Sequence, residues 1–584
     1  MQSLGPKHKF SVLKNMSALL IFIAGSLYIT YPLIFHLKNY IIGKGDELLL
    51  TWILNWNIHS FSTNILSIFN ANIFYPHSNT LAFSDALFLS SFLSIIPVKF
   101  FGEPLVAFNF TLISSLMLLG FCIYLLTNHL TKNFFSSVIS GLLVIFSLPV
   151  LNETPHLQVI AIYFVPLSIL FFLKFIEERK TKFFLITAVL FVLQTYNSFL
   201  PGYFIVFSLT IIYIFYFLRN KKEARNLINK RNLLILILSF AMIAPVVLPY
   251  LKVSNQFHYV RDIRDTIHFA LQPEDLLYPH PLTRLNPIIL KVFPQYDPNG
   301  ELKTGFLGLA FTILAITSLL YFVNRFKKLK YQDRSLFFIA VISLTLSLGP
   351  FLHIGRHTIH HPFPIPLPYL LFYYLIPGFN GMRNSARWEI LFILIVAVLI
   401  GVFLNAVPKN RKKTIVVYIF LISVIVGEFN FPMKFVSIPG VKNFPPEYYF
   451  LKENAPRSSI VEMPIYNWDM PPYGNQEMLR EYYSTLNFNP MVNGFSGFSP
   501  LEWESMVRDM IVNFPNPKTL KKLKEMRVDY VIIHKDEYAR MTKDHYKLRG
   551  KTLKSAETVL DQVKNYSNLQ LVKVYNDTYI YKLN

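Results

Sequence analysis

Cysteine and charged residues are scarce in this sequence. The 584 residues include one cysteine, Cys122, which lies inside an apolar run. One cysteine cannot form a disulfide within the chain or build a cysteine metal site. Charged residues make up 15% of the chain, whereas about 25% is usual in soluble proteins. The composition therefore argues against a soluble protein, and any part that folds outside a membrane must be held by packing alone.

The sequence also lacks the common motifs of soluble enzymes. It contains no glycine-rich phosphate loop, no HExxH, no GxSxG and no EF-hand pattern, so nucleotide chemistry and zinc-protease chemistry have no support. Four histidines do lie close together, at His353, His357, His360 and His361. The prolines that follow them indicate an irregular loop, and no carboxylate is near in sequence to complete a site. We therefore expect no metal site there.

Apolar and aromatic residues are abundant instead, at 53% and 16% of the chain. A helix needs about 20 apolar residues to cross a bilayer. Eleven runs meet or approach this length, at 16–36, 104–127, 134–151, 157–176, 183–200, 203–218, 232–251, 305–324, 335–352, 386–404 and 413–428. The sequence therefore predicts a polytopic α-helical membrane bundle.

Basic residues mark alternate connections between these runs. They gather in the segments 7–14, 132, 179–182, 219–231, 325–334 and 409–413. Lys and Arg are retained on the cytoplasmic side during insertion, so we expect a cytoplasmic N-terminus, an extracytoplasmic C-terminus and a location in the plasma (inner) membrane. The first run reads as an uncleaved signal anchor. Insertion and anionic lipid headgroups explain the net charge of +22, so we expect membrane lipids and no nucleic acid as partners.

Two segments of the first external loop, 37–103, are predicted to lie along the membrane. The stretch 86–101 is short and broken by Pro97, and a crossing there would invert every later basic loop. We expect it to be interfacial or re-entrant. In 47–60, Trp52 and Trp56 fall on an apolar helical face. That helix either lies at the headgroup level or packs against the bundle.

The composition becomes soluble after Glu428. Strand-like runs at 459–466, 528–534 and 569–583, the last split by Asn576-Asp577, alternate with helical patterns at 500–512 and 517–526. This mixture predicts a small α/β domain. We therefore expect a transmembrane domain over 1–430 and an extracytoplasmic α/β domain over 431–584.

Asp46 and Glu47 follow the first apolar run directly, in Gly-Lys-Gly-Asp-Glu. A carboxylate kept at a membrane surface usually serves proton transfer, ion binding or pairing. The alternative is an ion pair with Lys44 or plain solvation.

Several further motifs accompany this pair. They are Asn-Ile-Phe-Tyr-Pro at 72–76, Asp85, Pro-His-Leu-Gln at 155–158, Gly-Phe-Asn-Gly-Met-Arg at 378–383, and Arg387. With the layout of the whole chain, they resemble the GT-C superfamily of integral membrane glycosyltransferases, in its mannosyltransferase-like branch with the YfhO-type proteins. The chain departs from that pattern in one respect, because Asp46-Glu47 is a variant of a loose acidic motif and no second DxD follows.

The resemblance implies transfer of a sugar from a polyprenyl-phosphate donor to an extracytoplasmic glycan, lipid or protein acceptor. Such an enzyme needs a base for the acceptor hydroxyl and a cation for the leaving phosphate. The candidate bases are, in order, Asp46, Glu47 and Asp85. Arginine suits a phosphate through its planar fork and permanent charge, and the candidates are Arg383, Arg387, Arg261 and Arg264. The candidates for an acceptor groove are His156, Gln158 and Tyr75. No cofactor is certain, and a divalent cation is the one candidate.

Each assignment has a simpler alternative. Arg387 and Trp388 could anchor a span at the interface. Arg261 with Asp262, and Arg264 with Asp265, could be solvated ion pairs of little energetic value. An interfacial histidine such as His156 is often only hydrogen-bonded locally.

Two other functions also fit a many-span protein with external polar groups. One is a transporter or flippase of lipid-linked glycans, and the other is a non-catalytic cell-envelope assembly factor. Transporters usually carry charges or broken helices at the bilayer midplane. The predicted spans here are almost free of charge at their centres, which favours chemistry at the outer surface.

Overall fold

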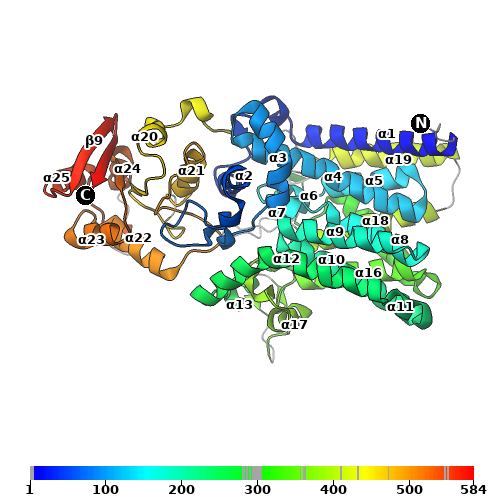
Figure 1. Ribbon diagram of the computed structural model, residues 1–584. Helices are drawn as coiled ribbons and strands as arrows, with labels where there is room; N and C mark the ends of the chain where they lie inside the picture. The colour runs from blue at the N-terminus through cyan, green and yellow to red at the C-terminus, as the bar shows by residue number, and fades with distance from the viewer. Residues whose placement is uncertain are drawn as a thin grey trace. The chain divides into compact units, whose positions relative to one another are not determined.

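The chain folds into two compact units, each built from segments far apart in sequence. The helical unit comprises Met1–Phe35, Thr111–Val246 and His258–Lys434, and the mixed unit comprises His36–Phe110, Val247–Phe257 and Phe435–Asn584. The structure is a computed structural model (Figure 1). It describes residues 6–278, 283–284, 287–288, 291, 305–354, 357–358, 363–407, 411–429, 433–470, 473–544, 547–548 and 551–584.

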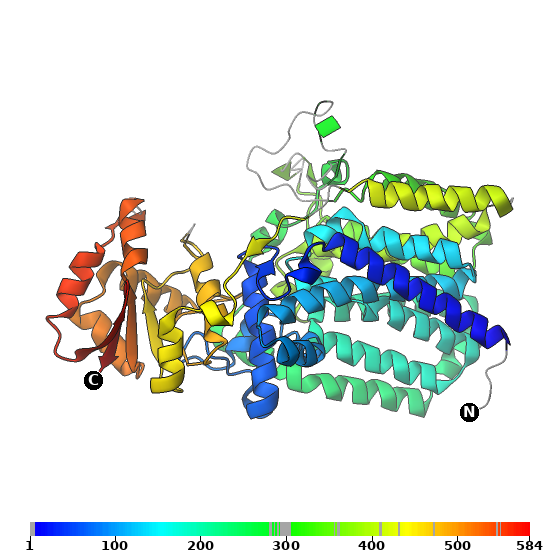
Figure 2. The ribbon, with the colours of Figure 1, turned by 90° about the horizontal axis from the view of Figure 1, so that it is seen from above.

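Long α-helices make up the helical unit, and Figure 2 shows the longest of them aligned in one direction. Two of its helices, α4 and α12, continue into the mixed unit. The helices are α1 (Pro6–Ile29), α4 (Leu105–Thr131), α5 (Phe134–Ile145), α6 (Leu148–Asn152), α7 (Leu157–Ile160), α8 (Phe164–Glu178), α9 (Thr181–Asn197), α10 (Phe199–Arg219), α11 (Lys221–Leu227), α12 (Lys230–Phe257), α13 (Ile263–His268), α15 (Leu309–Asn324), α16 (Tyr331–Ser347), α17 (Pro368–Leu375), α18 (Trp388–Ala406) and α19 (Arg411–Gly427). A short hairpin joins β2 (His353–Ile354) to β3 (His357–Thr358).

Each of the eleven predicted runs coincides with a helix or a pair of helices. Among the described residues, six segments are long and apolar enough to cross a membrane: Val12–Ile29, Leu105–Thr131, Leu157–Glu178, Phe199–Arg219, Lys230–Phe257 and Ser385–Ala406. Three more runs form shorter apolar helices, Phe134–Ile145, Leu309–Asn324 and Ile415–Gly427. The remaining two runs correspond to α9 and α16. The chain is therefore a multi-pass membrane protein, and the orientation of its ends stays a prediction.

Helix α18 lies in the core of the helical unit. Every side chain from Trp388 to Gly401 is buried, and the helix packs against α5, α15 and α16. A helix that is apolar on all sides is expected to be surrounded by others. The first turn of α18 is thereby held in a fixed position, which matters for Arg387 directly before it.

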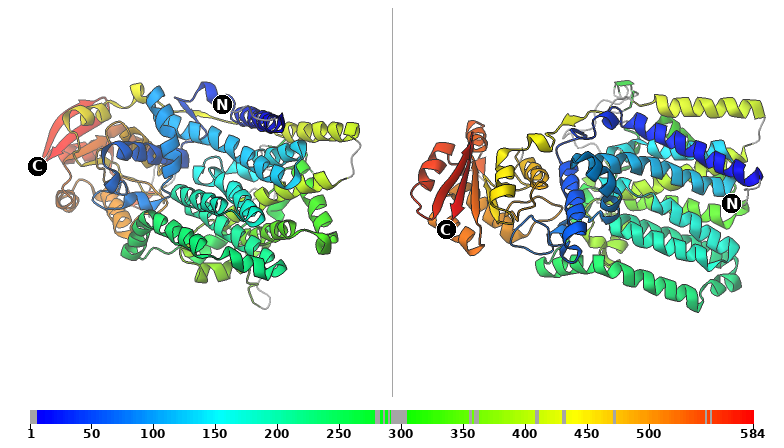
Figure 3. Two further views of the ribbon diagram at one scale, coloured as in Figure 1. Left: turned by 45° about the vertical axis from the view of Figure 1, so that its right-hand side comes forward. Right: turned by 45° about the horizontal axis from the view of Figure 1, so that its top comes forward.

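The mixed unit contains a four-stranded sheet with the order β5-β6-β10-β9. Strand β5 (Ile460–Met463) is parallel to β6 (Tyr530–His534), and β10 (Thr578–Leu583) is antiparallel to both β6 and β9 (Leu569–Tyr575). Figure 3 shows β9 and β10 as red arrows near the C-terminus. The predicted hairpin turn is confirmed, because Asn576 between these strands has a φ of 45°.

Helices cover this sheet and extend the unit. They are α2 (Asp46–Thr63), α3 (Phe88–Phe101), α20 (Pro446–Asn454), α21 (Asn475–Ser484), α22 (Leu501–Asn513), α23 (Pro517–Glu525), α24 (Lys535–Lys543) and α25 (Ala556–Val563). Two small pairs complete it, β1 (Tyr40–Ile41) with β4 (Val436–Ser437), and β7 (Lys547–Leu548) with β8 (Lys551–Thr552). The predicted α/β tail is therefore present, and it folds together with the first loop. The predicted domain boundary at residue 430 stays a prediction.

Helix α2 belongs to the mixed unit. It packs against α3 and α21 within that unit, and its polar residues Thr51 and Asn55 are buried. These side chains satisfy backbone groups, since Thr51 Oγ1 donates to Glu47 O at 2.7 Å and Asn55 Nδ2 donates to Pro104 O at 3.0 Å. Trp52 is 1% exposed and donates from Nε1 to Asn72 Oδ1 at 3.0 Å. A tertiary hydrogen bond and packing therefore hold the Trp52 indole, and its predicted headgroup level stays a prediction.

Helix α3 covers the predicted interfacial stretch. Its 14 residues are about 21 Å long, which is less than the roughly 30 Å of a hydrocarbon core. Phe92, Ile96 and Phe100 are 63–80% exposed and recur every fourth residue, so they form one apolar stripe. The length and the stripe agree with the predicted interfacial helix.

Residues 72–75 of the first loop run beside the tail. Met491 N donates to Asn72 O at 2.7 Å, Tyr75 N donates to Met491 O at 2.9 Å, and Phe74 N donates to Asn493 O at 3.0 Å. Met491 in turn bridges Ile460 of β5. The Asn-Ile-Phe-Tyr-Pro motif thus extends the sheet region, which gives it a structural role.

Candidate functional site

The predicted site residues fall into both units. The helical unit contains His156, Gln158, Arg261, Arg264, Arg383 and Arg387, and the mixed unit contains Asp46, Glu47, Tyr75 and Asp85. Within the helical unit, the structure brings His156 and Arg387 onto one carboxylate, Glu153. This three-residue group is named the Glu153 cluster below.

The Glu153 cluster joins three short segments. Glu153 is the C-cap of α6, His156 is the N-cap of α7, and Arg387 directly precedes α18. His156 Nδ1 lies 3.0 Å from Glu153 Oε2, and Arg387 Nε lies 3.3 Å from the same oxygen. The side chains of Glu153, His156 and Arg387 are 14%, 27% and 20% exposed. The cluster is thus shielded but open to a ligand.

Glu153 is ionised in this environment. Burial opposes the charge of its carboxylate, but the positive charge of Arg387 and the neighbouring His156 outweigh this effect and lower the pKa of Glu153 to about 2. An ionised Glu153 holds the cationic side chains in place.

The guanidinium of Arg387 uses only part of its hydrogen-bonding capacity. An arginine has five N–H donors in a planar fork. Within the described part of the chain, Nε alone faces a carboxylate, and no hydrogen bond from the two Nη groups is found. A partly exposed fork with free ends is suited to two phosphate oxygens at once. Arg387 therefore carries the clearest anion-binding geometry among the predicted residues.

The Gly-Phe-Asn-Gly-Met-Arg motif explains how Arg387 reaches this place. Gly378 has a φ of 77°, a left-handed conformation that glycine adopts without strain. Phe379 is 1% exposed and its ring packs against Trp388 at 5.8 Å. Backbone contacts then fix the loop, since Ala386 N donates to Phe269 O at 3.3 Å and Ser385 Oγ donates to Thr266 O at 3.2 Å.

The other three arginines lie in different surroundings. The guanidinium of Arg383 stacks over the Phe269 ring at 4.5 Å, and that of Arg261 stacks over Tyr259 at 5.0 Å. Arg264 is 85% exposed and pairs with Asp262 at 2.7 Å. The predicted pairing of Arg264 with Asp265 is therefore replaced by one with Asp262, which N-caps α13 and accepts the Arg264 backbone N–H.

The sequence predicted no role for Glu389 or for Glu153. Glu389, in the first turn of α18, is 4% exposed, and no partner of its Oε1 is found among the described residues. Glu153 lies just before the fourth predicted span. The position of each glutamate beside a long apolar run could have indicated a role, because an acidic residue at such a position is seldom kept without a partner.

In the mixed unit, Asp46 and Glu47 begin α2. Glu47 is 6% exposed, and its Oε2 accepts a hydrogen bond from Gly45 N at 2.9 Å. A Cβ atom at Gly43 would collide with the Glu47 carboxylate. The glycines of Gly-Lys-Gly-Asp-Glu therefore wrap around Glu47, while Asp46 is only partly buried. Both charges lie at a helix N-terminus, which favours carboxylates.

The three remaining predicted residues differ in setting. Asp85 is partly buried beside Ser84, whose carbonyl accepts a hydrogen bond from Tyr250 Oη at 2.7 Å. Tyr75 is fixed through its backbone, as described above. Gln158 lies in α7 with its Oε1 buried, and no partner for that oxygen is found among the described residues. A direct part in binding stays a prediction for all three.

The described residues contain no group of three or more His, Cys, Asp or Glu side chains placed to bind a metal ion. His360 and His361 lie outside the described residues. A divalent cation thus has no ligand set in the described part, and its involvement stays a prediction.

Solved structures share this fold. The chain resembles the oligosaccharyltransferase AglB from Archaeoglobus fulgidus in complex with an inhibitory peptide and a dolichol-phosphate, with a TM-score of 0.51, 12% identity, and 98% of this chain and 75% of that chain covered. The same protein with Zn and sulfate gives a TM-score of 0.52 at 12% identity, over 90% and 69%. The arabinofuranosyltransferase AftD from Mycobacteria gives 0.50 at 11% identity, over 98% of this chain and 40% of that chain.

These neighbours are GT-C glycosyltransferases, so the predicted GT-C fold is confirmed. The YfhO-type branch stays a prediction. No curated protein matches the sequence. A family model matches residues 52–426, which is well over half of the chain, and the protein belongs to that family, described as Domain of unknown function (DUF6311).

Proposed function

We propose that this protein is a membrane glycosyltransferase that moves a sugar from a polyprenyl-phosphate donor to an extracytoplasmic glycan, lipid or protein. The observation that carries the proposal is Arg387, whose Nε faces an ionised Glu153 and whose Nη groups have no hydrogen-bond partner among the described residues. The fold supports it, since neighbours with the same fold transfer sugars and one of them is bound to dolichol-phosphate.

In this reaction, the acceptor oxygen forms a bond to the anomeric carbon of the sugar. The bond between that carbon and the phosphate oxygen breaks, and its electron pair stays on the leaving polyprenyl phosphate. Donors aimed at the oxygen on which charge develops lower the barrier. Arg387 performs this task through its two Nη groups, and Glu153 fixes the guanidinium by its Nε.

Asp46 is the proposed base that accepts the proton of the acceptor hydroxyl. It is preferred over Glu47 because Asp46 is only partly buried, whereas Glu47 is 6% exposed. Asp85 is the third candidate. No step is assigned to a metal ion, and an EDTA arm in the assay below tests whether a divalent cation is needed.

The first prediction tests this base by an in vitro transfer assay. Full-length protein in detergent is given a panel of synthetic polyprenyl-phosphate sugars and a cell-envelope extract as acceptor. Replacing Asp46 by Asn keeps the shape and removes the charge, and loss of a general base typically lowers the rate by about 100- to 10,000-fold. Donor binding should remain, since the phosphate is bound elsewhere.

A matched control is Asp536→Asn, which changes an exposed carboxylate of the same unit and should leave turnover unchanged. Near-normal turnover in both Asp46→Asn and Glu47→Gln would show that neither residue is the general base, and Asp85 would become the candidate. If the wild type translocates donor lipid in vesicles without forming product, the transporter function replaces the proposed one. If it does neither, the protein is a non-catalytic assembly factor.

A further inference from the structure

A cavity of about 300 Å³ opens in the helical unit at the junction of α8, α9, α11 and α12. Eight residues line it, namely Phe175, Arg179, Thr181, Glu223, Asn226, Leu227, Asn229 and Asn232. The predicted site residue Gln158 precedes α8, whereas Phe175 and Arg179 lie at its far end. The 15 residues of α8 alone separate its two ends by about 22 Å. The cavity is therefore distinct from the Glu153 cluster.

Its lining is rich in polar side chains, including three asparagines at every third position. Asn232 is 5% exposed. Its Nδ2 donates to Leu227 O at 2.8 Å, but no donor to its Oδ1 is found among the described residues. A buried amide oxygen without a donor is costly. A ligand with a hydroxyl group would satisfy it.

One cation lines the cavity and further basic residues are close to its lining in sequence. Arg179 donates from Nη2 to Glu223 Oε2 at 2.6 Å and from Nη1 to Glu223 O at 3.1 Å. This pair holds Arg179 at the mouth, and its side chain is 36% exposed. Further cations are exposed nearby in sequence, at Lys180, Lys182, Lys221, Lys222, Arg225, Lys230 and Arg231. An anionic group is thus favoured beside the asparagines.

Large apolar side chains are exposed around this polar cavity. Leu218 and Ile228 are 65% and 66% exposed, and Leu233 and Leu234 are 49% and 55% exposed. Ile228 and Leu233 adjoin lining residues in sequence, Leu218 and Leu234 lie within five positions of one, and α12 is a candidate membrane span. A ligand with a polar anionic head and apolar tails would contact both surfaces.

From this arrangement we propose a second binding site, which takes the phosphate-bearing, hydroxyl-rich headgroup of an anionic phospholipid. A cavity of this size lies at the lower end of the range for small ligands, about 300–1,000 Å³, so it holds a headgroup while the acyl chains lie on the exposed leucines. Basic pockets between membrane helices on the cytoplasmic side are suited to such headgroups. The basic loops here are predicted to be cytoplasmic, so the lipid belongs to the inner leaflet. The site does not depend on the proposed transfer reaction.

The test measures lipid binding by native mass spectrometry of the full-length protein in detergent. Phosphatidylglycerol is the probe, and phosphatidylethanolamine is the zwitterionic comparison. Asn226 is exposed at the cavity rim near the end of α11, so its replacement should not disturb folding. Asn226→Asp should lower the affinity for phosphatidylglycerol about fivefold, and Asn226→Lys should raise it by a similar factor.

Asn324 provides matched controls, because it is exposed at the end of α15, beside the basic segment 325–334 and outside the cavity lining. Asn324→Asp and Asn324→Lys make the same charge changes and should have little effect. If the substitutions at positions 226 and 324 had equal effects, the proposed site would be rejected, because the lipid would then be attracted by the basic surface in general. Equal binding of the two lipids would also overturn it.

A soluble competitor shows whether the bound phosphate belongs to a lipid headgroup or to a free phosphate ester. Glycerol 3-phosphate presents the same head chemistry without acyl chains, and we expect it not to displace phosphatidylglycerol. Displacement by glycerol 3-phosphate at low concentration would overturn the lipid assignment and make the ligand a free phosphate ester.

Discussion

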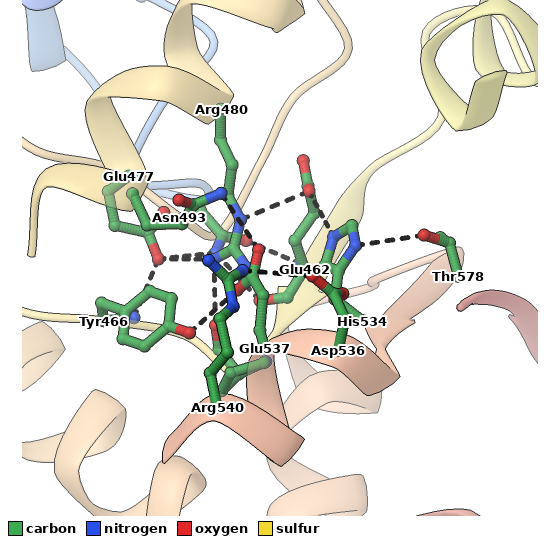
Figure 4. Close-up of polar contacts among 12 residues, drawn as sticks. Glu462, Tyr466, Glu477, Arg480, Asn493, His534, Asp536, Glu537, Arg540 and Thr578 are labelled. Atoms are coloured by element: carbon green, nitrogen blue, oxygen red, sulfur yellow. Dashed lines mark hydrogen bonds and ion pairs between the residues drawn. The ribbon is translucent and has the colours of Figure 1, made fainter. Parts of the chain in front are cut away.

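Two arginines in this protein bind carboxylates in opposite ways. Arg387 of the helical unit is 20% exposed and faces one carboxylate through Nε. Arg480 of the mixed unit is 1% exposed, and Figure 4 shows it surrounded by the acidic side chains of three segments. Among the described residues the first guanidinium has Nη donors without a partner, whereas the second is enclosed by its own unit.

The contacts of Arg480 are numerous. Its Nη2 lies 2.6 Å from Glu537 Oε2, its Nη1 lies 2.8 Å from Glu477 Oε1, and its Nε lies 3.4 Å from Glu462 Oε2. Nη1 also donates to Pro464 O at 2.9 Å. Glu462 additionally contacts His534 Nε2 at 2.8 Å. This network, named the Arg480 network, joins α21 to β5, β6 and α24.

The difference separates a structural role from a binding role. A buried ion pair compensates its own desolvation only when its polar atoms are satisfied from within. In the Arg480 network both Nη groups donate to protein oxygens, whereas no hydrogen bond from Nε is found among the described residues. The guanidinium is 1% exposed, so it has little capacity for a ligand. Arg387 leaves donors to be satisfied from outside, which is the property a phosphate site needs.

The largest expected effect comes from breaking the Arg480 network. Arg480→Met leaves three buried carboxylates without their cation, and removal of one partner of a buried ion pair typically destabilises a protein by about 3–5 kcal/mol. The mixed unit should lose resistance to trypsin and unfold at a lower temperature. Thermal unfolding followed by fluorescence, with limited proteolysis, measures this.

Arg540→Met is the control for that variant. Arg540 is 57% exposed and pairs with Asp536 on α24, so its loss should change stability little. If Arg480→Met were as stable as Arg540→Met, the Arg480 network would not hold the mixed unit together.

Much of the fold could be predicted from the sequence because apolar run length and loop charge are local signals. The helices, the Asn576 hairpin and the α/β tail follow from such patterns. The burial of α2 could not be predicted, because it depends on α21, more than 400 residues later in the chain. The Arg480 network was missed for the same reason, since its members are spread over the tail and none forms a motif.

The site was predicted in part. Arg387 and His156 were chosen from motifs that mark the ends of spans, and the structure brings them together. Their shared partner Glu153 was not chosen, because nothing in the sequence shows that residues 153 and 387 meet. Asp46 and Glu47 lie at the start of α2, but only coordinates show that Glu47 is buried and Asp46 only partly so.

The next effect concerns donor binding by Arg387. Arg387→Ala removes charged hydrogen bonds worth about 1.5–3 kcal/mol, so the dissociation constant for a polyprenyl phosphate should rise about 10- to 150-fold. Arg387→Lys should restore only part of the affinity, because lysine lacks the planar fork. Equilibrium binding of a labelled polyprenyl phosphate measures both. An unchanged constant in Arg387→Ala would move the phosphate to Arg383 or Arg261.

A smaller effect is the pH dependence of the Arg480 network. Burial raises the pKa of Glu477 to about 7, although Arg480 lowers it. Burial alone would lower the pKa of His534, but Glu537 and Glu462 outweigh this and raise it. A folded-state pKa above the ordinary value adds stability at low pH that is lost as pH rises through the folded pKa. The mixed unit should therefore lose on the order of 2 kcal/mol of stability between pH 5 and pH 8.

Thermal unfolding at pH 5 and at pH 8 checks this sign. Glu477→Gln, which cannot ionise, should flatten the dependence, whereas Glu525→Gln at an exposed site of α23 should not. Carboxylates with a lowered pKa, such as Glu462, change stability only at a pH below this range. If the mixed unit gained stability with rising pH, burial would not be the dominant cause of the raised pKa of Glu477.

The smallest effect is expected at Arg264, which the resemblance offered as a phosphate ligand alongside Arg387. Arg264 is 85% exposed, and its Nε and Nη2 both donate to Asp262 Oδ2, at 3.0 and 2.7 Å. An exposed ion pair is screened by water and salt, and a ligand would have to displace Asp262 to use the fork. Arg264→Gln should therefore leave the dissociation constant for a polyprenyl phosphate within about twofold of wild type. The same binding assay, run beside Arg387→Ala, decides between the two arginines. A loss at Arg264 as large as that at Arg387 would show that an exposed, paired arginine can serve as the anion site and that free donors are not its distinguishing mark.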